Sequence, residues 1–220
     1  MPKRSKNHVN NLPLFTQSET PLLFDPCYYE KTAREEGYHL IAGVDEAGRG
    51  PLAGPVVAAA VVVPFGLVLD GVTDSKKLSP GAREDAFQLI DQKAVAIGIG
   101  VVSQMLIDEI NILRASLEAM KRAVLALSPK PDFILVDGNQ PIPFWIPQRC
   151  IIKGDQKSIS ISAASIMAKV YRDRIMLAFD EHFPEYGFSS NKGYGTADHR
   201  RALKIYGPSP VHRLSFKGVQ

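Results

Sequence analysis

Two adjacent carboxylates, Asp45 and Glu46, lie between an apolar stretch and the glycine-flanked Arg49. Like charges this close raise each other's pKa unless a cation or a donor compensates, and carboxylate oxygens are usual ligands of Mg²⁺ and Mn²⁺. Gly48 and Gly50 allow the backbone to approach a ligand closely, and the Arg49 guanidinium offers a planar fork of donors to a phosphate or a sugar hydroxyl. Metal-binding acids beside a phosphate-reading turn indicate phosphodiester chemistry.

Two other interpretations of this stretch have to be weighed. For a single Asp-Glu pair, a structural turn with solvated acids remains open. Residues 48–53 also fit the G-x-G-x-x-A dinucleotide pattern, with Asp70 near the expected acidic position. That fingerprint requires a helix to begin at the glycines. Residues 54–64 instead form a valine-rich run bracketed by prolines, which predicts a buried strand and excludes the dinucleotide interpretation.

Two further acids follow short apolar stretches in a similar way. Asp137 comes directly after residues 133–136, and Asp155 follows residues 150–152 and a Lys-Gly pair. Each acid alone fits an ordinary turn. Because ligand sites in open α/β sheets lie at the carboxyl ends of strands, neighbouring strands would bring all four carboxylates together. Such a cluster repels itself without cations, and two ions about 4 Å apart support hydrolytic phosphoryl transfer.

Composition bounds these possibilities. The 220 residues suit one domain, and 45% hydrophobic with 22% charged content is ordinary for a soluble protein. A net charge of +3 and a pI near 8.8 permit a polyanionic partner without demanding one. Cys27 and Cys150 lack metal-ligand spacing, and the chain has neither a signal sequence nor an apolar run that could span a bilayer. We expect a cytoplasmic protein with reduced thiols.

The organisation along the chain predicts one folded domain. Residues 1–24 are polar and lack apolar periodicity, which predicts a flexible N-terminal tail before a domain spanning 25–220. Strands are expected at 40–44, 56–63, 95–102, 133–136 and 150–152, and helices at 26–36, 81–93, 113–127, 158–182 and 197–206. Strands that first follow one another and then alternate with helices predict a mixed α/β sheet covered by helices.

Taken together, the chain resembles bacterial ribonuclease HII, the type 2 ribonuclease H family. The blocks that carry the resemblance occur in family order and are residues 43–56, 74–78, 136–139, 153–155, 161–173 and 193–196, with His212-Arg213 near the end. They cover nearly all of the expected domain, and the combined pattern is highly specific.

The resemblance implies a fold, an activity and a set of site residues. The fold is a ribonuclease H-like mixed five-stranded sheet flanked by helices, with a C-terminal helical extension. The activity is endonucleolytic cleavage of RNA in RNA–DNA hybrids and at single ribonucleotides in duplex DNA, with Mn²⁺ or Mg²⁺. The implied metal-binding catalytic acids are Asp45, Glu46, Asp137 and Asp155. The implied substrate contacts are Gly48, Arg49, Gly50 and Tyr194, to which we add Lys76, Lys77, Asn139 and Lys169 as expected contacts.

Alternatives remain for the function and for the tail. Ribonuclease HIII has a similar acidic site but carries Lys where this chain has Arg49, and a non-catalytic hybrid-binding protein would have no use for four acids. The Asn11-Leu12-Pro13-Leu14-Phe15 segment resembles the Gln-Leu-x-Leu-Phe peptide that docks on the sliding clamp. The same apolar side chains could instead cover the protein's own surface. We expect a monomer.

Overall fold

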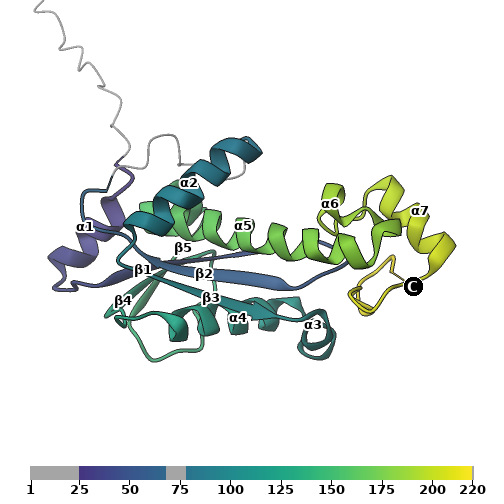
Figure 1. The fold of residues 1–220 in the computed structure, drawn as a ribbon. Helices are drawn as coiled ribbons and strands as arrows, with labels where there is room; N and C mark the ends of the chain where they lie inside the picture. Colours follow the sequence, from purple (N-terminus) through teal and green to yellow (C-terminus); the bar gives the residue numbers. More distant parts are fainter. Residues whose placement is uncertain (1–24, 68–77, 220) are drawn as a thin grey trace, which may run out of the picture.

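The chain forms a mixed five-stranded sheet between two layers of helices, and the computed structural model describes residues 25–67 and 78–219 (Figure 1). The strands are β1 (Ile41–Ala47), β2 (Val56–Val62), β3 (Ala96–Val102), β4 (Phe133–Asp137) and β5 (Gln148–Ile151). Their order in space is β3-β2-β1-β4-β5. The pairs β1–β2 and β2–β3 are antiparallel, whereas β1–β4 and β4–β5 are parallel. The predicted mixed sheet is confirmed.

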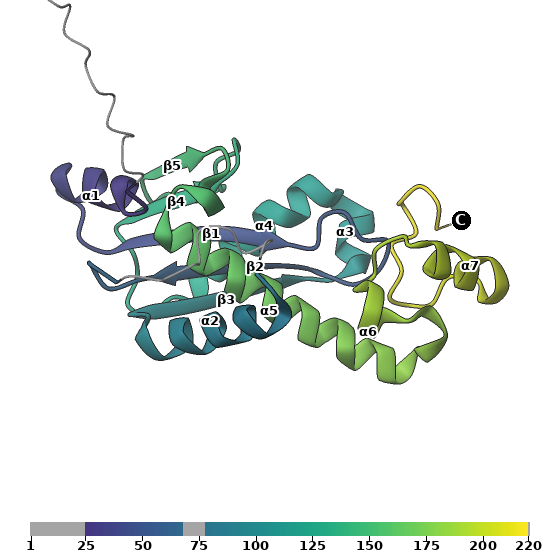
Figure 2. The same ribbon diagram turned by 90° about the horizontal axis from the view of Figure 1, so that it is seen from above.

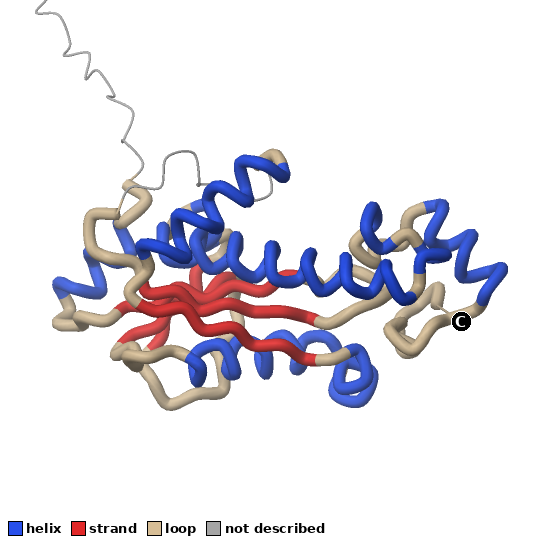
Figure 3. The backbone as a smooth tube through the Cα atoms, viewed as in Figure 1, coloured by secondary structure: helices blue, strands red, loops and turns tan. Residues whose placement is uncertain are grey.

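Helices cover both faces of this sheet, as the blue and red segments of Figure 3 show. They are α1 (Tyr28–Glu35), α2 (Pro80–Lys93), α3 (Gln104–Ile110), α4 (Ile112–Ala126), α5 (Ile159–His182), α6 (Phe188–Asn191) and α7 (Ala197–Tyr206), with single 3-10 turns at Gly154–Gln156 and Pro184–Tyr186. Helices α2 and α5 lie on one face, and α3 and α4 lie on the other (Figures 1 and 2). None of the described helices is long and apolar enough to cross a membrane.

The continuous apolar run of β2 is explained by burial on both faces. Val56, Ala58 and Ala60 pack in the core beneath α4, whereas Ala59 and Val61 pack beneath α5 and α2. Side chains alternate between the faces of a strand, so a strand with helices on both sides has no position left for a polar residue. The valine-alanine run therefore forms the strand that its composition predicts.

Side-chain caps fix where most helices begin. The capping residues are Ser79 for α2, Ser103 for α3, Asn111 for α4, Ser158 for α5 and Thr196 for α7. Asn111 has a φ of 68° and accepts hydrogen bonds from the backbone N–H groups of Leu113 and Arg114, at 3.0 and 3.2 Å. It therefore separates α4 from the short helix α3, which the sequence pattern did not predict.

Three element boundaries differ from the sequence prediction by two residues or more, and one of them is the start of β5, at Gln148 and not at residue 150. The first strand continues to Ala47, so Asp45 and Glu46 lie within β1, paired with Ala59 and Ala58 of β2, and not in a turn after the strand. Helix α1 begins at Tyr28, later than predicted, because the Asp25 carboxylate accepts the Cys27 N–H at 2.9 Å before the helix starts. The predicted tail, residues 1–24, lies outside the described residues.

The C-terminal extension packs on the far half of α5. Helices α6 and α7 lie beyond the end of the sheet (Figures 1 and 2). Met176 of α5 shares an apolar cluster there with Tyr186, Phe188 and Leu203, and this cluster includes Leu52 from the loop after β1. Backbone hydrogen bonds tie the same loop to the extension, from Leu52 N to Gly193 O at 2.8 Å and from Arg213 N to Leu52 O at 2.9 Å.

Close packing of β1 against α5 makes a specific prediction at Gly43. A Cβ atom there would lie 2.1 Å from the carbonyl carbon of Ser160 and 2.2 Å from the nitrogen of Ile161, both helix backbone. Gly43→Ala should therefore lower the free energy of unfolding by at least about 1–3 kcal/mol. Gly81→Ala is the control, since a Cβ there meets nothing within 4 Å. It should change stability by less than about 1 kcal/mol, in the stabilising direction. Equal denaturant midpoints for the two variants would contradict the prediction.

Candidate active site

A cavity of about 510 Å³ opens where β1 ends, and it joins the acids to the predicted substrate-reading turn. Its lining residues come from β1, the loop after it, β4, α2, α5 and the C-terminal extension. They are Asp45, Glu46, Ala47, Gly48, Arg49, Gly50, Arg83, Asp137, Ser165, Lys169, Arg172 and Tyr194. Residues separated by up to 149 positions in the sequence thus face one space.

The register of β1 and β4 brings the acids together. Val44 pairs with Val136 in parallel strands, so Asp45 and Asp137 are the next residues on adjacent strands. Burial raises the pKa of Asp45 well above its usual value, the charges of Glu46 and Asp137 raise it further, and a hydrogen bond with Ser165 opposes them. The geometry thus concentrates negative charge that a cation would stabilise.

Glu46 connects the acids to the turn. Burial raises its pKa, and Arg49 opposes this shift because its Nη1 lies 3.1 Å from Glu46 Oε1. The Arg49 side chain is half exposed, whereas that of Glu46 is almost fully buried. The guanidinium therefore stands at the mouth of the acidic site.

Asp155 lies in the turn that contacts Asp137. The Asp137 Oδ1 atom accepts a hydrogen bond from the Gly154 N–H at 2.6 Å, and Asp155 follows in the same 3-10 turn with only 2% of its surface exposed. Asp155 does not line the cavity. The structure thus brings three of the four predicted acids to the cavity. The fourth, Asp155, directly follows Gly154, whose N–H donates to Asp137.

The donor set suits a hard divalent cation, although its side chains do not form a closed metal centre. In residues 25–67 and 78–219, no group of three or more His, Cys, Asp or Glu side chains is arranged to hold an ion. The carboxylates of Asp45, Glu46 and Asp137 nevertheless share one cavity, and the charge of Asp137 helps to raise the pKa of both Asp45 and Glu46. Carboxylate oxygens that repel each other are the ligands that Mg²⁺ and Mn²⁺ prefer, so these three residues would hold such an ion.

The predicted substrate contacts lie differently around this cavity. Gly48, Arg49, Gly50 and Tyr194 all line it, and the Tyr194 side chain is 47% exposed. Gly50 approaches the Tyr194 ring so closely that a Cβ at Gly50 would lie 3.6 Å from Cε1. Asn139 follows β4 but does not line the cavity. Lys76 and Lys77 lie outside the described residues.

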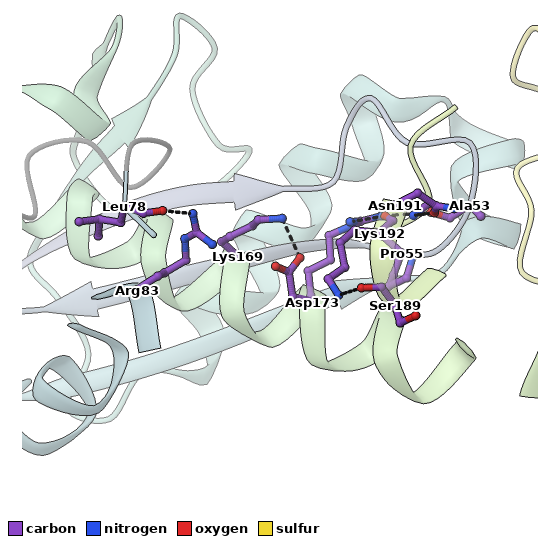
Figure 4. Close-up of polar contacts among 11 residues, drawn as sticks. Ala53, Pro55, Leu78, Arg83, Lys169, Asp173, Ser189, Asn191 and Lys192 are labelled. Atoms are coloured by element: carbon purple, nitrogen blue, oxygen red, sulfur yellow. Dashed lines mark hydrogen bonds and ion pairs between the residues drawn. The ribbon is translucent and has the colours of Figure 1, made fainter. Parts of the chain in front are cut away.

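Lys169 lines the cavity and is already paired with an acid. Its Nζ lies 2.7 Å from Asp173 Oδ1, as Figure 4 shows. In the same view the Arg83 side chain points to the carbonyl oxygen of Leu78, to which Nη2 donates at 2.8 Å. The cavity therefore has a cationic wall formed by α2 and α5.

Sequence reasoning missed four of the lining residues, namely Ala47, Arg83, Ser165 and Arg172. A helical pattern would have found two of them, because Ser165, Lys169 and Arg172 follow at i, i+4 and i+7 on one face of α5. Arg83 on α2 has no such signal, since its position beside the acids depends on how α2 packs against α5.

A buried pair of histidines supports the loop that carries Tyr194. The Ser209 N–H donates to His212 Nδ1 at 2.9 Å, so neutral His212 carries its proton on Nε2. That atom lies 2.9 Å from His199 Nε2, which accepts, and His199 Nδ1 then donates to the Tyr194 carbonyl oxygen at 2.9 Å. Burial lowers the pKa of His199, and burial together with His199 lowers the pKa of His212 to about 4.

Comparisons with known proteins agree with this geometry. The family model described as ribonuclease HII matches residues 42–219. The ribonuclease HII of Geobacter sulfurreducens is 54% identical over 210 residues, covering 96% of this chain and 95% of the relative. That of Syntrophus aciditrophicus is 56% identical over 190 residues, covering 86% of this chain and 90% of the relative.

Solved structures support the same assignment. The ribonuclease H2 of Pyrococcus horikoshii superposes with a TM-score of 0.71 at 30% identity, covering 82% of this chain and 95% of that one. The ribonuclease HII in a PCNA complex from Archaeoglobus fulgidus gives 0.69 at 30% identity, with coverages of 81% and 96%. A ribonuclease HIII solved with Mn²⁺ gives 0.66 at 19% identity, covering 85% of this chain and 70% of that one, and shows the fold alone.

Fold and site together define a nuclease of the ribonuclease H type, a class that depends on divalent metal ions and acts on RNA–DNA hybrids. The chain belongs to the ribonuclease HII family and is a type 2 ribonuclease H endonuclease.

The buried histidine pair predicts acid sensitivity. Since the pKa of His212 is about 4 in the folded protein and 6.5 ordinarily, the unfolded chain binds a proton there that the folded one excludes. Stability should fall as the pH is lowered from about 6.5 toward 4, by up to about 1.4 kcal/mol per pH unit for this group. The free energy of unfolding can be measured with urea at several pH values between 7 and 5. It should fall less steeply with decreasing pH for His212→Gln than for wild type. His182→Gln, at an exposed helix end, should keep the wild-type slope. Identical slopes for all three proteins would refute the assignment.

Proposed function

We propose that this chain cleaves RNA in RNA–DNA hybrids and also cuts at single ribonucleotides embedded in duplex DNA, leaving 3′-hydroxyl and 5′-phosphate ends. The observation that carries the proposal is the shared cavity, in which Asp45 and Asp137 face the turn of Gly48 to Gly50 and the ring of Tyr194. Because the acids and the residues that would contact the ribose line the same cavity, the phosphodiester bond next to the recognised ribose can be cleaved there.

The acids are assigned to metal binding. Asp45, Glu46, Asp137 and Asp155 would hold two Mg²⁺ or Mn²⁺ ions, which supply an attacking hydroxide and stabilise the leaving oxygen. Asp45 is suited to this role because burial, and then the charges of Glu46 and Asp137, raise its pKa, and bound cations would relieve that repulsion. Asp155 would join the set from the Gly154 turn, whose N–H donates to Asp137.

The turn and Tyr194 are assigned to ribose recognition. Only the 2′-hydroxyl distinguishes RNA from DNA at a given site, so the enzyme has to contact it. Arg49 and the backbone beside it reach the cavity, and the exposed Tyr194 ring offers an apolar face to the neighbouring sugar. Because Arg49 is paired with Glu46, the recognition turn and the acids are held in a fixed relation.

Positive groups around the cavity are assigned to the phosphate backbone. Lys169 lines the cavity and would exchange its pairing with Asp173 for a phosphate, with Lys76, Lys77 and Asn139 as further contacts. Arg83 joins this set on its position. Such contacts fix the register of the duplex without specifying sequence. We assign the whole activity to one monomeric domain that begins at residue 25.

Asp45→Asn tests the assignment of the acids. The variant should lose more than about 100-fold in cleavage of a DNA duplex holding one ribonucleotide, because one metal ligand and its charge are gone. Its affinity for that duplex should be unchanged or higher, since less negative charge faces the phosphates. Glu118→Gln is the control, an acid on α4 paired with Arg122 on the opposite side of the sheet, and it should cleave like wild type. Substantial turnover by Asp45→Asn with Mg²⁺ would refute the metal assignment.

The same substrate separates the proposal from its nearest rival. Ribonuclease HIII structures share the fold at 19–20% identity, and that family favours runs of RNA. Efficient cutting at a lone ribonucleotide would support the present assignment. Cleavage confined to longer RNA stretches would contradict it.

We also propose that residues 11–15 dock on the sliding clamp. The support is their resemblance to the clamp-binding peptide, together with a solved complex of PCNA with the Archaeoglobus fulgidus ribonuclease HII. Residues 11–15 lie outside the described residues, so the proposal depends on sequence. Two leucines and a phenylalanine can fill an apolar pocket, and Pro13 restricts the chain beforehand.

A peptide of residues 10–20 provides the test. It should bind the bacterial clamp at least about tenfold more tightly than the same peptide with Leu14→Ala and Phe15→Ala, since these side chains supply the apolar contacts. Calorimetry or fluorescence anisotropy would measure both. Equal affinities would end the proposal, whereas competition by an established clamp-binding peptide would support it.

A further inference from the structure

Arg213 is a fully buried arginine that binds backbone in place of an acid. Its side chain is 0% exposed, and the hydrogen bonds that its guanidinium makes to described residues all end on backbone carbonyls, while the charge of Asp108 acts on it from outside hydrogen-bond contact. Its guanidinium donates to five carbonyl oxygens, those of Gly48 at 2.6 Å, Arg49 at 3.0 Å, Pro51 at 2.9 Å, Gly54 at 2.9 Å and Pro55 at 3.2 Å. All five belong to the loop that follows β1.

Burying a charged guanidinium costs free energy unless hydrogen bonds replace its contacts with water. Burial and the nearby Arg172 lower its pKa to about 9, which still leaves the guanidinium protonated at neutral pH. Desolvation is offset here by the carbonyl dipoles, each of which turns its negative end toward the cation. Arginine suits this position because its planar fork carries five donors, whereas lysine carries three on a single atom.

The contacts of Arg213 determine which way the neighbouring amides face. In a trans peptide the carbonyl and the following N–H point in opposite directions. Because the carbonyls of Gly48 and Arg49 face Arg213, the N–H groups of Arg49 and Gly50 face away from it. Neither N–H donates to a partner within the described part of the chain, and both residues line the cavity. The peptide between Pro51 and Leu52 shows the same opposition. Its carbonyl oxygen accepts a hydrogen bond from Arg213, and its N–H donates to the carbonyl oxygen of Gly193.

We propose that Arg213 is the positioning residue of the recognition turn. By holding the carbonyls of Gly48 and Arg49, it presents the N–H groups of Arg49 and Gly50 to an oxygen of the ribonucleotide and places a positive charge behind them. Consecutive amides that converge in this way bind oxygen atoms that carry negative charge. The inference rests on the proposed function, because it deepens the role of the turn in reading ribose.

Arg172 also donates to carbonyl oxygens of the loop after β1. It donates from Nε to Pro55 O at 3.1 Å and from Nη2 to Ala53 O at 3.1 Å. Gly48, with a φ of 98°, lies so close to it that a Cβ would come within 2.1 Å of Nε. Arg172 thus holds the end of the loop at Ala53 and Pro55. Among the side chains that the structure describes, only Arg213 donates to the carbonyls of Gly48 and Arg49.

Binding without cleavage tests this role. Fluorescence anisotropy in EDTA gives dissociation constants for two duplexes of one sequence, all-DNA or with a single ribonucleotide. Wild type should prefer the ribonucleotide duplex. Arg213→Gln should lower that preference about tenfold while all-DNA affinity stays within about threefold, because the amides lose their orientation and the backbone contacts remain. Arg213→Lys, which retains the charge without the fork, should fall between them and carries the test if the glutamine variant does not fold.

Met120→Ala is the matched control for lost stability. It removes a buried side chain of α4, which packs on the face of the sheet opposite α5. It should lower the melting temperature without changing the preference for the ribonucleotide duplex. An unchanged preference in a folded Arg213 variant would overturn the inference while leaving the proposed function intact. Parallel losses on both duplexes would also overturn it, as they indicate a general structural role. A wild-type protein without any preference would instead refute ribose reading by the turn.

Discussion

The parallel pairing of β1 with β4 is the constraint on which the site depends. Register alone makes Asp45 and Asp137 neighbours, because Val44 pairs with Val136 on adjacent central strands. Both strands are buried on both faces, so the acids at their ends are partly removed from water and cannot be relieved by solvent. The pKa of Asp45 is raised by this burial and by the charges of Glu46 and Asp137. A sheet with another strand order would separate these carboxylates and leave no reason for a metal to bind.

Helix α5 transmits this constraint to the rest of the molecule. Its first half approaches β1 so closely that only glycine fits at Gly43, and the same turns bring Ser165 to the acids. Its second half leaves the sheet and carries the cluster that seats the C-terminal extension (Figure 2). One continuous helix therefore sets the distance between the acids and the extension.

The loop after β1 is where these two parts meet. Its carbonyls are bound by Arg172 from α5 and by Arg213 from the extension, while the Tyr194 carbonyl is bound by the His199–His212 pair. Buried cations and neutral histidines thus fix backbone that would otherwise have no regular partner, in keeping with the rule that buried polar groups are paired. This arrangement stabilises recognition and cleavage surfaces through the same contacts, so a change in the extension reaches the turn directly.

The sequence by itself determined the layered sheet, most helix starts and the family. Apolar runs such as that of β2 and the acids that follow apolar stretches are local signals, which can be recognised within a few residues. The motif blocks then named the four acids and the turn.

Only the tertiary structure decided how those residues meet. It placed Asp45 and Glu46 inside β1, left Asp155 out of the cavity lining, and paired Lys169 with Asp173. It also recruited Arg213, whose partners lie 158 to 165 positions away in the chain. A local pattern cannot specify such contacts, because the cost of burying a charge is repaid only by backbone groups that folding brings from elsewhere in the chain.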